Sequence, residues 1–494
     1  MKYPLLFTLF MLLSGCFPPD LQQSVIQVIV TKQPGDSDQP WQKKKPFKAE
    51  FMGTLVTYGA KKDLGILTTA AAVQEGVQIE GKRHGGGTPL GLKVVHWDSE
   101  VNLALLAFTE PPHKSLRPME LGDPVGLGTK VYGMQWSRDL TTLSPVELQM
   151  RRVEVGESLL GAYMVPQYFL EGPKDALDYA APIVAENRLL GLFENQSNQE
   201  IQAIPLPLIR RFLKEPTAGV PSFGFSTQRL EDPNLRAYHK IPEAQEGVRI
   251  TEIDEESGLT DKVKSGDLLL SIAGNPINRR GQYPHPLRGA LPYTYLLSSF
   301  SVGEPVPISV YQGGKVHTHT VILGRFDSNA RKIPYFSEDL LTKIPHLIFG
   351  GLVFQELTLE YLRTWGPTWR ATGPIPFLYL WSHRNKKSDE HRFVILNRTL
   401  SDPFTTGYEQ IAESLVSEVN GKKIHSLEDL NLAFQTPTSR KIQNQTEDFA
   451  VIRLAQAGGE IILPYKGLEE AHVRLKETWK MYEATFFSRA VGAH

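Results

Sequence analysis

The sequence predicts a mostly-β protein of several domains. The chain has 494 residues, its Gly 41 and Pro 35 supply frequent turns, and its apolar residues fall in many short runs of strand length. Hydrophobic residues are 41% and charged residues 22%, as in globular proteins. Lys+Arg 53 and Asp+Glu 54 give a net charge of −1, without the basic excess typical of nucleic-acid-binding proteins.

The first element is an N-terminal signal. Lys2 is followed by the apolar run Leu5–Leu13, which is too short to span a membrane and is typical of a secretory signal. Cys16 is the one cysteine of the chain, so an intrachain disulfide and a cysteine-ligated zinc site are both excluded.

The segment Leu13-Ser14-Gly15-Cys16 resembles the lipobox of bacterial lipoproteins. The resemblance implies removal of a signal peptide of residues 1–15 and a lipid on Cys16. The body would then be anchored in a bacterial cell envelope, in the periplasm or at the surface. Phe17 replaces the Asp that marks inner-membrane retention in enteric bacteria, which favours the outer membrane. An ordinary secreted protein with an incidental cysteine is the alternative.

Residues 16–50 contain a strand pattern, Ser24–Val30, followed by a polar tether from Gln33 to Lys48. Residues 51–215 contain short apolar stretches separated by turns, which predicts an all-β barrel or sandwich that starts at about residue 22. The predicted strands are Gly53–Tyr58, Gly65–Thr69, Val77–Glu80, Leu92–Trp97, Leu103–Phe108, Lys130–Met134 and Ile183–Phe193. Leu206–Lys214 has helical spacing and closes this block.

Residues 222–325 and 334–480 form two further blocks that repeat one order of elements. In each block, two strands and a turn precede a β-hairpin. The second-block strands are Gly247–Ile253, Leu268–Ala273, Pro307–Tyr311 and Val316–Leu323. The third-block strands are Phe393–Leu396, Leu415–Val419, Phe449–Leu454 and Glu460–Leu463, with a helix over Leu427–Phe434. The tail, residues 470–488, is predicted to be an amphipathic helix.

Three segments of the first block resemble the HtrA/Deg serine proteases. Gly65–Val73 is similar to the strand and turn that carry the catalytic histidine, and Asp98–Leu106 is similar to the segment of the catalytic aspartate. Leu177–Ile183 falls where the family has Gly-Asn-Ser-Gly-Gly-Pro-Leu. The spacings of 31 residues (102 − 71) and 77 residues (179 − 102) suit the family. The resemblance implies a trypsin-like double β-barrel followed by two PDZ-like domains.

Each catalytic position of the family is substituted in this chain. The general base falls on Ala71, the orienting acid on Asn102 and the nucleophile on Tyr179. Acyl transfer in this fold needs a hydroxyl activated by an imidazole that a carboxylate holds. Ala71 cannot move a proton, and Asn102 has no charge to stabilise an imidazolium. The sequence therefore predicts a pseudoprotease in which Tyr179 fills the vacated pocket.

The turn that forms the family's oxyanion hole is altered as well. Leu177, Ala180 and Ala181 carry Cβ atoms that penalise positive φ, whereas the family has glycine at these positions. The alternative function is an active serine endopeptidase with an atypical site, in which His84 or His96 supplies the base.

We expect neither a metal nor a cofactor. His317 and His319 lie two residues apart on one predicted strand, but the sequence places no third ligand nearby.

The second block resembles the PDZ domain of the Deg type. Phe223-Gly224-Phe225 is similar to the loop whose backbone N–H groups hold a peptide carboxylate while the peptide adds as a strand. Gly247–Ile250 and Ser265–Gly274 match the strands that follow this loop in the family.

The third block resembles the divergent second PDZ of plant-type Deg proteins through Ile348–Phe354 and Val419–Lys422. Gly351 and Leu352 are its predicted peptide-binding residues. The resemblance implies peptides or unfolded envelope proteins as partners, with assembly into a homo-oligomer or with an active paralogue.

Overall fold

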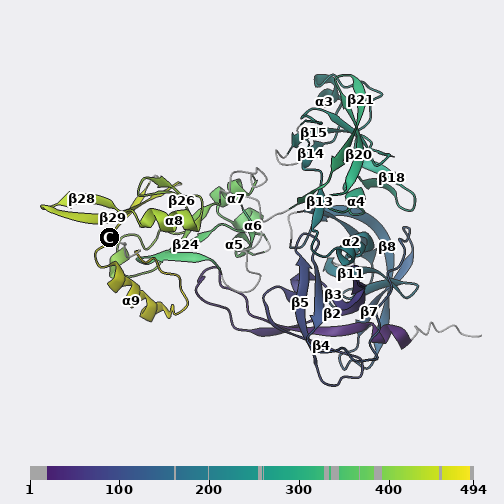
Figure 1. The fold of residues 1–494 in the computed structure, drawn as a ribbon, viewed down its shortest axis with the longest axis horizontal. Helices are drawn as coiled ribbons and strands as arrows, with labels where there is room; N and C mark the ends of the chain where they lie inside the picture. Colours follow the sequence, from purple (N-terminus) through teal and green to yellow (C-terminus); the bar gives the residue numbers. More distant parts are fainter. Residues whose placement is uncertain are drawn as a thin grey trace, which may run out of the picture.

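The computed structural model describes residues 19–489 except 161–162, 198–199, 254–258, 260, 327–332, 335–343, 367, 383–391 and 456–458. The signal segment and Cys16 lie outside the described residues. Two closed β-barrels, a PDZ-like sheet above them and a C-terminal sheet beside them make up the chain (Figure 1). Among the described residues, every helix is too short or too polar to cross a membrane.

The first barrel has the strand order β1-β2-β3-β6-β5-β4. Its strands are β1 (Val25–Lys32), β2 (Phe47–Tyr58), β3 (Asp63–Thr68), β4 (Gly76–Lys82), β5 (Leu90–Asp98) and β6 (Leu103–Phe108). Branched side chains fill its interior, among them Val28, Leu55 and Ile66, which are fully buried. The short helix α1 (Ala70–Val73) follows β3. Thr69 is its N-cap, and the Thr69 side chain accepts a hydrogen bond from the Ala72 N–H.

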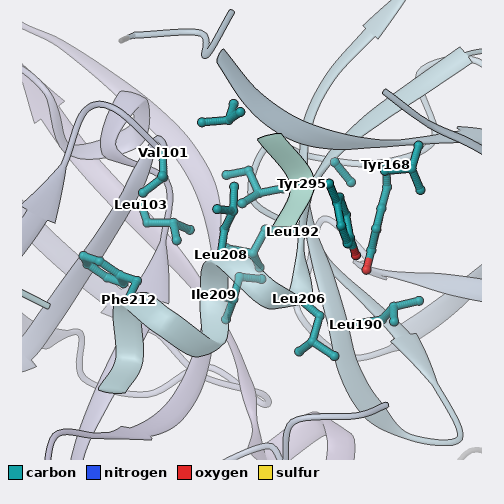
Figure 2. Close-up of a cluster of buried hydrophobic side chains, with 14 of the residues drawn as sticks. Val101, Leu103, Tyr168, Leu190, Leu192, Leu206, Leu208, Ile209, Phe212 and Tyr295 are labelled. Carbon is teal, nitrogen blue, oxygen red and sulfur yellow. The ribbon is translucent and has the colours of Figure 1, made fainter. Parts of the chain in front are cut away.

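The second barrel has the strand order β10-β11-β12-β9-β8-β7. Its strands are β7 (Lys130–Trp136), β8 (Leu143–Glu157), β9 (Met164–Glu171), β10 (Pro182–Ala185), β11 (Arg188–Ser197) and β12 (Glu200–Pro205). The helix α2 (Leu206–Lys214) closes the two-barrel body, and Figure 2 shows its residues Leu208 and Ile209 in one buried cluster with Leu103 of the first barrel and Leu192 of the second. The predicted double barrel is confirmed.

The PDZ-like sheet has the order β14-β15-β16-β20-β21, with β17 paired to β16. These strands are β14 (Phe225–Gln228), β15 (Val248–Ile253), β16 (Leu268–Ile272), β17 (Asn275–Pro276), β20 (Pro305–Gln312) and β21 (Lys315–Ile322). Two small pairs accompany the sheet: β13 (Val220–Ser222) with β22 (Gly324–Phe326), and β18 (Gln282–His285) with β19 (Gly289–Pro292). The helices are α3 (Pro233–Tyr238) and α4 (Thr294–Leu297).

Arg288 joins this unit to the second barrel. The side chain is 4% exposed and lies at the β18–β19 turn. Its Nε donates to Val125 O at 3.0 Å, and its other nitrogens donate to the hydroxyls of Tyr295 (2.5 Å) and Tyr168 (3.0 Å). The guanidinium also lies 4.7 Å from the centre of the Tyr168 ring. The hydroxyl ends of the two tyrosines lie side by side in Figure 2. The Arg288 guanidinium therefore links β9 of the second barrel, which carries Tyr168, to α4, which carries Tyr295.

The C-terminal sheet has the order β23-β24-β25-β26-β29-β28, with β27 on β26 and β30 on β29. Its strands are β23 (His346–Phe349), β24 (Leu352–Glu356), β25 (Val394–Thr399), β26 (Ser414–Val419), β27 (Lys422–Lys423), β28 (Thr438–Ile442), β29 (Gln445–Leu454) and β30 (Glu460–Pro464). Its helices are α5 (Leu359–Arg363), α6 (Trp369–Thr372), α7 (Ile375–Ser382), α8 (Leu427–Phe434) and α9 (Leu468–Trp479).

Two expectations about the chain's ends are wrong. The predicted tether is docked on the C-terminal unit: Trp41 is buried against Ile348, and Ser37 O accepts from the side chains of Gln355 (3.1 Å) and Asn397 (3.0 Å). The predicted tail helix ends at Trp479, because Lys480 takes a left-handed φ of 52°. The chain after it forms a parallel bridge to β23 instead of a helix.

Candidate functional site

Ala71 and Asn102 meet at the junction of the two barrels. The Ala71 N–H donates to Asn102 Oδ1 at 2.9 Å, and the Ala70 N–H donates to Asn102 O at 3.2 Å. Asn102 is fully buried and holds a left-handed φ of 53°, which Asn tolerates better than most residues. The amide thus binds the backbone at the position where the family would place an imidazole.

Glu194 supplies a buried carboxyl group to this place from β11. Asn102 Nδ2 donates to Glu194 Oε1 at 2.8 Å, and the carboxyl also accepts a backbone hydrogen bond from Leu159. Burial raises the pKa of Glu194, which is 4% exposed. The Asn102–Glu194 bond crosses from one barrel to the other and serves as a structural link. An isolated glutamate gave no sequence signal for this role.

Tyr179 lies on the same junction but does not fill it. Its carbonyl oxygen accepts from the Met52 N–H at 2.9 Å, and its ring stacks on Phe193 with a centroid distance of 5.6 Å. The residue is 52% exposed, so the expectation that the ring would fill a vacated pocket is wrong. Phe193 precedes Glu194, so Tyr179 and Asn102 contact consecutive residues of β11.

The nucleophile turn is held in an unfavourable conformation. Ala180 has φ 65°, and its N–H donates to Phe193 O at 2.9 Å. Ala181 is outside the positive-φ region, contrary to the glycine pattern of the family. Leu177 is buried against Gly133 of β7. A Cβ atom placed on Gly133 would lie only 2.6 Å from the Leu177 side chain. The side chain that replaces the family's glycine therefore packs into the second barrel.

Ala180→Gly is expected to stabilise the chain by about 1 kcal/mol, because glycine adopts φ 65° without a Cβ penalty. Ala181→Gly is the matched control and should destabilise by about 0.5–1 kcal/mol, since its backbone gains nothing from glycine. Urea unfolding of both variants measures the two effects. Equal urea midpoints for Ala180→Gly and the unmodified chain would show that the Ala180 backbone is not strained.

An aromatic segment of the C-terminal unit covers this junction. We call residues 359–382, which include α5, α6 and α7, the aromatic cover. Its buried side chains form one cluster with Ala70 and Leu160, and Ala71 and Trp97 pack against that cluster. These side chains are Leu359, Tyr361, Leu362, Trp369, Phe377 and Trp381. Figure 1 shows the cover between the C-terminal sheet and the barrels.

Two arginines hold the aromatic cover to the second barrel. Arg363 donates to Leu159 O at 3.0 Å, and Arg370 donates to Glu157 Oε2 at 2.6 Å. Leu159 is also the residue whose backbone binds Glu194. The cover therefore reaches the link that joins Asn102 to the second barrel.

The histidines considered as substitutes make other contacts. The His84 ring stacks on Trp136, 5.6 Å between centroids. His96 lines a cavity of about 380 Å³ with Asp98, Glu100 and Arg325, at the edge of the first barrel and the β13–β22 pair. His317 and His319 stack on one face of β21, and no group of three metal-ligating side chains occurs within the described residues.

The loop Phe223-Gly224-Phe225 precedes an edge strand, and its Gly224 N–H donates to Ser222 Oγ at 3.0 Å. Gly224 is left-handed at φ 70°, and the two phenylalanine rings stack 5.2 Å apart. Phe223 is 4% exposed, whereas Phe225 is half-buried. β14 follows directly and ends its sheet: among the described strands it pairs with β15 alone. The other edge of β14 therefore has no strand partner among the described residues.

The matching loop of the third block is occupied by the chain itself. β24 pairs with β23 on one side and β25 on the other, so it has no open edge. The Gly350 N–H donates to His472 Nε2 at 3.0 Å, and Leu352 is fully buried. The prediction that Gly351 and Leu352 bind a peptide is therefore wrong: hairpin formation by β23 fills the position of a ligand strand.

Comparison with known proteins places these observations in a family. The family model of the PDZ domain matches residues 337–484. The mitochondrial Do-like 3 protein of Arabidopsis thaliana is 26% identical over 448 residues, covering 87% of this chain and 75% of its own length. The chloroplastic protease Do-like 2 of the same plant is 23% identical, over 82% of this chain and 67% of its own. The chain is a homologue of the HtrA/Deg proteases.

Among solved structures, this HtrA/Deg homologue is similar to the HtrA-type protease AlgW with decapeptide. The TM-score is 0.45 at 15% identity, over 62% of this chain and 96% of that one.

Proposed function

We propose that this HtrA/Deg homologue is a pseudoprotease that binds extended peptides at β14. The observation that carries the proposal is an edge strand, β14, that directly follows the left-handed Gly224 loop. The same chain holds Ala71, Asn102 and Tyr179 at the triad positions. Backbone pairing along β14 is tolerant of sequence, so the chain would accept many peptides or unfolded envelope proteins.

The chemistry at the barrel junction supports the loss of peptidase activity. Asn102 Oδ1 is engaged by the Ala71 N–H, and its amide nitrogen is engaged by Glu194. Of the two histidines considered as a substitute base, neither is placed to take a proton from a hydroxyl, since His84 stacks on Trp136 and His96 lines another cavity. Tyr179 offers a phenol on a longer side chain, which is a poor nucleophile at neutral pH.

The full chain is expected to cleave no unfolded protein substrate and to take no label from a serine-directed phosphonate probe. The triple variant Ala71→His, Asn102→Asp, Tyr179→Ser should also stay inactive, because its new carboxylate would lie against Glu194 and its imidazole would enter the aromatic cover. Stoichiometric labelling that disappears on mutation of one serine would instead support an active endopeptidase with an atypical site.

We also propose that Cys16 carries lipid and anchors the chain in the cell envelope, in the outer membrane. The support is the signal-like start and the lipobox resemblance. Cys16→Ser should move the protein from the membrane fraction to the soluble fraction, measured by fractionation of cells that express each form. A variant that stays with the membrane would contradict the anchor.

The partners that fit this proposal are unfolded envelope proteins and either further copies of the chain or an active paralogue. Capture from a native envelope extract with the soluble body, residues 17–494, separates these two modes of assembly. An intact catalytic serine in the captured proteins would indicate the paralogue.

A further inference from the structure

The cavity of about 380 Å³ lies where the linker after α2 passes the first barrel. One of its walls is the turn that follows β5, with Asp98 and Glu100, and another is the β13–β22 pair, with Arg325. None of its lining residues belongs to β14 or to the three triad positions. A volume of this size is typical of small-molecule sites in proteins.

The wall from the first barrel is acidic and fixed by hydrogen bonds. Asp98 Oδ1 accepts from the Glu100 N–H at 2.9 Å, and Glu100 Oε2 accepts from the Tyr163 N–H at 3.2 Å. Glu100 is 7% exposed, so its charge is held with little water around it. Burial raises the pKa of Asp98, and the guanidinium of Arg211, buried on α2, opposes that rise. The turn therefore places two acidic residues on one wall in a fixed geometry.

The wall from the PDZ-like unit is basic. Arg325 pairs with Pro221 in the β13–β22 register, and its side chain is exposed. A Cβ placed on Gly219 would lie 2.7 Å from Arg325 Nε, so the guanidinium stem lies along the linker. The Tyr163 ring packs on Phe326 at 4.8 Å between centroids, and the Tyr163 hydroxyl donates to Pro221 O at 2.8 Å. These contacts hold the basic wall against the second barrel.

We propose that this cavity binds a free α-amino acid with an apolar side chain, with its ammonium on the Asp98–Glu100 turn and its carboxylate on Arg325. A guanidinium binds a carboxylate through two parallel hydrogen bonds, and a carboxylate is a strong acceptor for an ammonium group. Trp97 and Phe326 line the same cavity and supply apolar surface for the ligand's side chain.

The balance of charge at the cavity favours a zwitterion over simpler ligands. An inorganic anion drawn to Arg325 would meet the charges of Asp98 and Glu100, and a simple amine drawn to the acidic wall would meet Arg325. An amino acid carries both charges and satisfies both walls. The bound molecule would join the first barrel to the β13–β22 pair, and it depends neither on peptide binding at β14 nor on peptidase activity.

Calorimetric titration of the full chain with L-phenylalanine, and with L-leucine as a smaller probe, tests the site. We expect a Kd of about 1 mM or tighter for at least one of them. N-acetyl-L-phenylalanine lacks the ammonium and L-phenylalaninamide lacks the carboxylate, so each should bind at least about tenfold more weakly than phenylalanine. Bound amino acid should also slow hydrogen exchange in peptides that cover 95–100 and 216–220. Failure of both probes to bind at about 10 mM would overturn the proposal.

Two variants locate the charges that hold the ligand. Arg325→Gln removes the basic group from an exposed position, and Glu100→Gln keeps an oxygen that accepts from the Tyr163 N–H. Each should weaken binding of the amino acid at least about tenfold. Lys315→Gln, at the exposed start of β21, is the control for loss of a cation and should keep the affinity of the unmodified chain.

Gly224→Val separates this site from the one proposed at β14. It should leave amino-acid binding unchanged, because Gly224 does not line the cavity. Loss of binding in Gly224→Val would place the amino acid at the β14 loop and overturn the assignment, as would unchanged affinity in Arg325→Gln. If Glu100→Gln does not fold, Arg325→Gln and the two blocked analogues decide the result.

Discussion

Gly224→Val is expected to weaken the binding of a C-terminal peptide by the full chain at least about 100-fold. The unmodified site should bind with a micromolar Kd, about −8 kcal/mol. Gly224 has φ 70°, a conformation that a β-branched residue adopts only with strain, and the new side chain would crowd the carboxylate. Titration of a labelled peptide library by fluorescence anisotropy measures the loss.

Gly289→Val is the matched control in the same unit. Gly289 has φ 72° and no atom within 4 Å of its Cβ position, so this variant carries similar backbone strain away from β14. It should keep the affinity of the unmodified chain. Binding that survives Gly224→Val, or survives amidation of the peptide carboxylate, would exclude this mode and turn attention to the barrel junction.

Arg288→Ala is expected to destabilise the joint between the PDZ-like sheet and the second barrel by about 3–5 kcal/mol. The change removes the hydrogen bonds to Val125, Tyr168 and Tyr295, and leaves a void between two buried rings. Protection of β18, β19 and α4 from hydrogen exchange should therefore fall more than about 100-fold. Arg288→Lys should restore little, because an ammonium cannot reproduce the planar fork.

Arg280→Ala is the control for loss of a cation in the same unit. Arg280 pairs with Glu231 at 2.6 Å, but its side chain is 66% exposed. Such a pair contributes about 0–1 kcal/mol, so exchange should hardly change. Equal effects of the two variants would show that Arg288 does not fasten the joint.

The sequence was most informative where local pattern and global structure agree. Short apolar runs of strand length such as Leu103–Phe108, separated by turns, predicted the barrels, because the inward side chains must be apolar in any barrel. Glycine at 224 marked a turn that needs positive φ. Both signals depend on neighbours within a few residues.

What the sequence could not predict depends on partners far along the chain. Glu194 meets Asn102 across 92 positions, and nothing beside Glu194 indicates that contact. The α7 segment is apolar on all sides, so the spacing of its hydrophobic residues did not show which face packs on the barrels. Trp41 lies in a polar stretch, yet tertiary packing buries it against Ile348. The second PDZ loop looked available because its glycines matched, while its blockage comes from β23 and His472.

The hairpin of β23 and β24 has a consequence for valency. A PDZ unit whose ligand position is filled by its own covalently attached strand faces a competitor at very high effective concentration, which free peptides at ordinary concentration cannot displace. With the proposed site at β14, each chain would then offer one peptide site, and calorimetric titration should saturate at one peptide per chain. Multivalent capture of an unfolded protein would require several copies side by side, so the number of chains in an assembly would set its avidity.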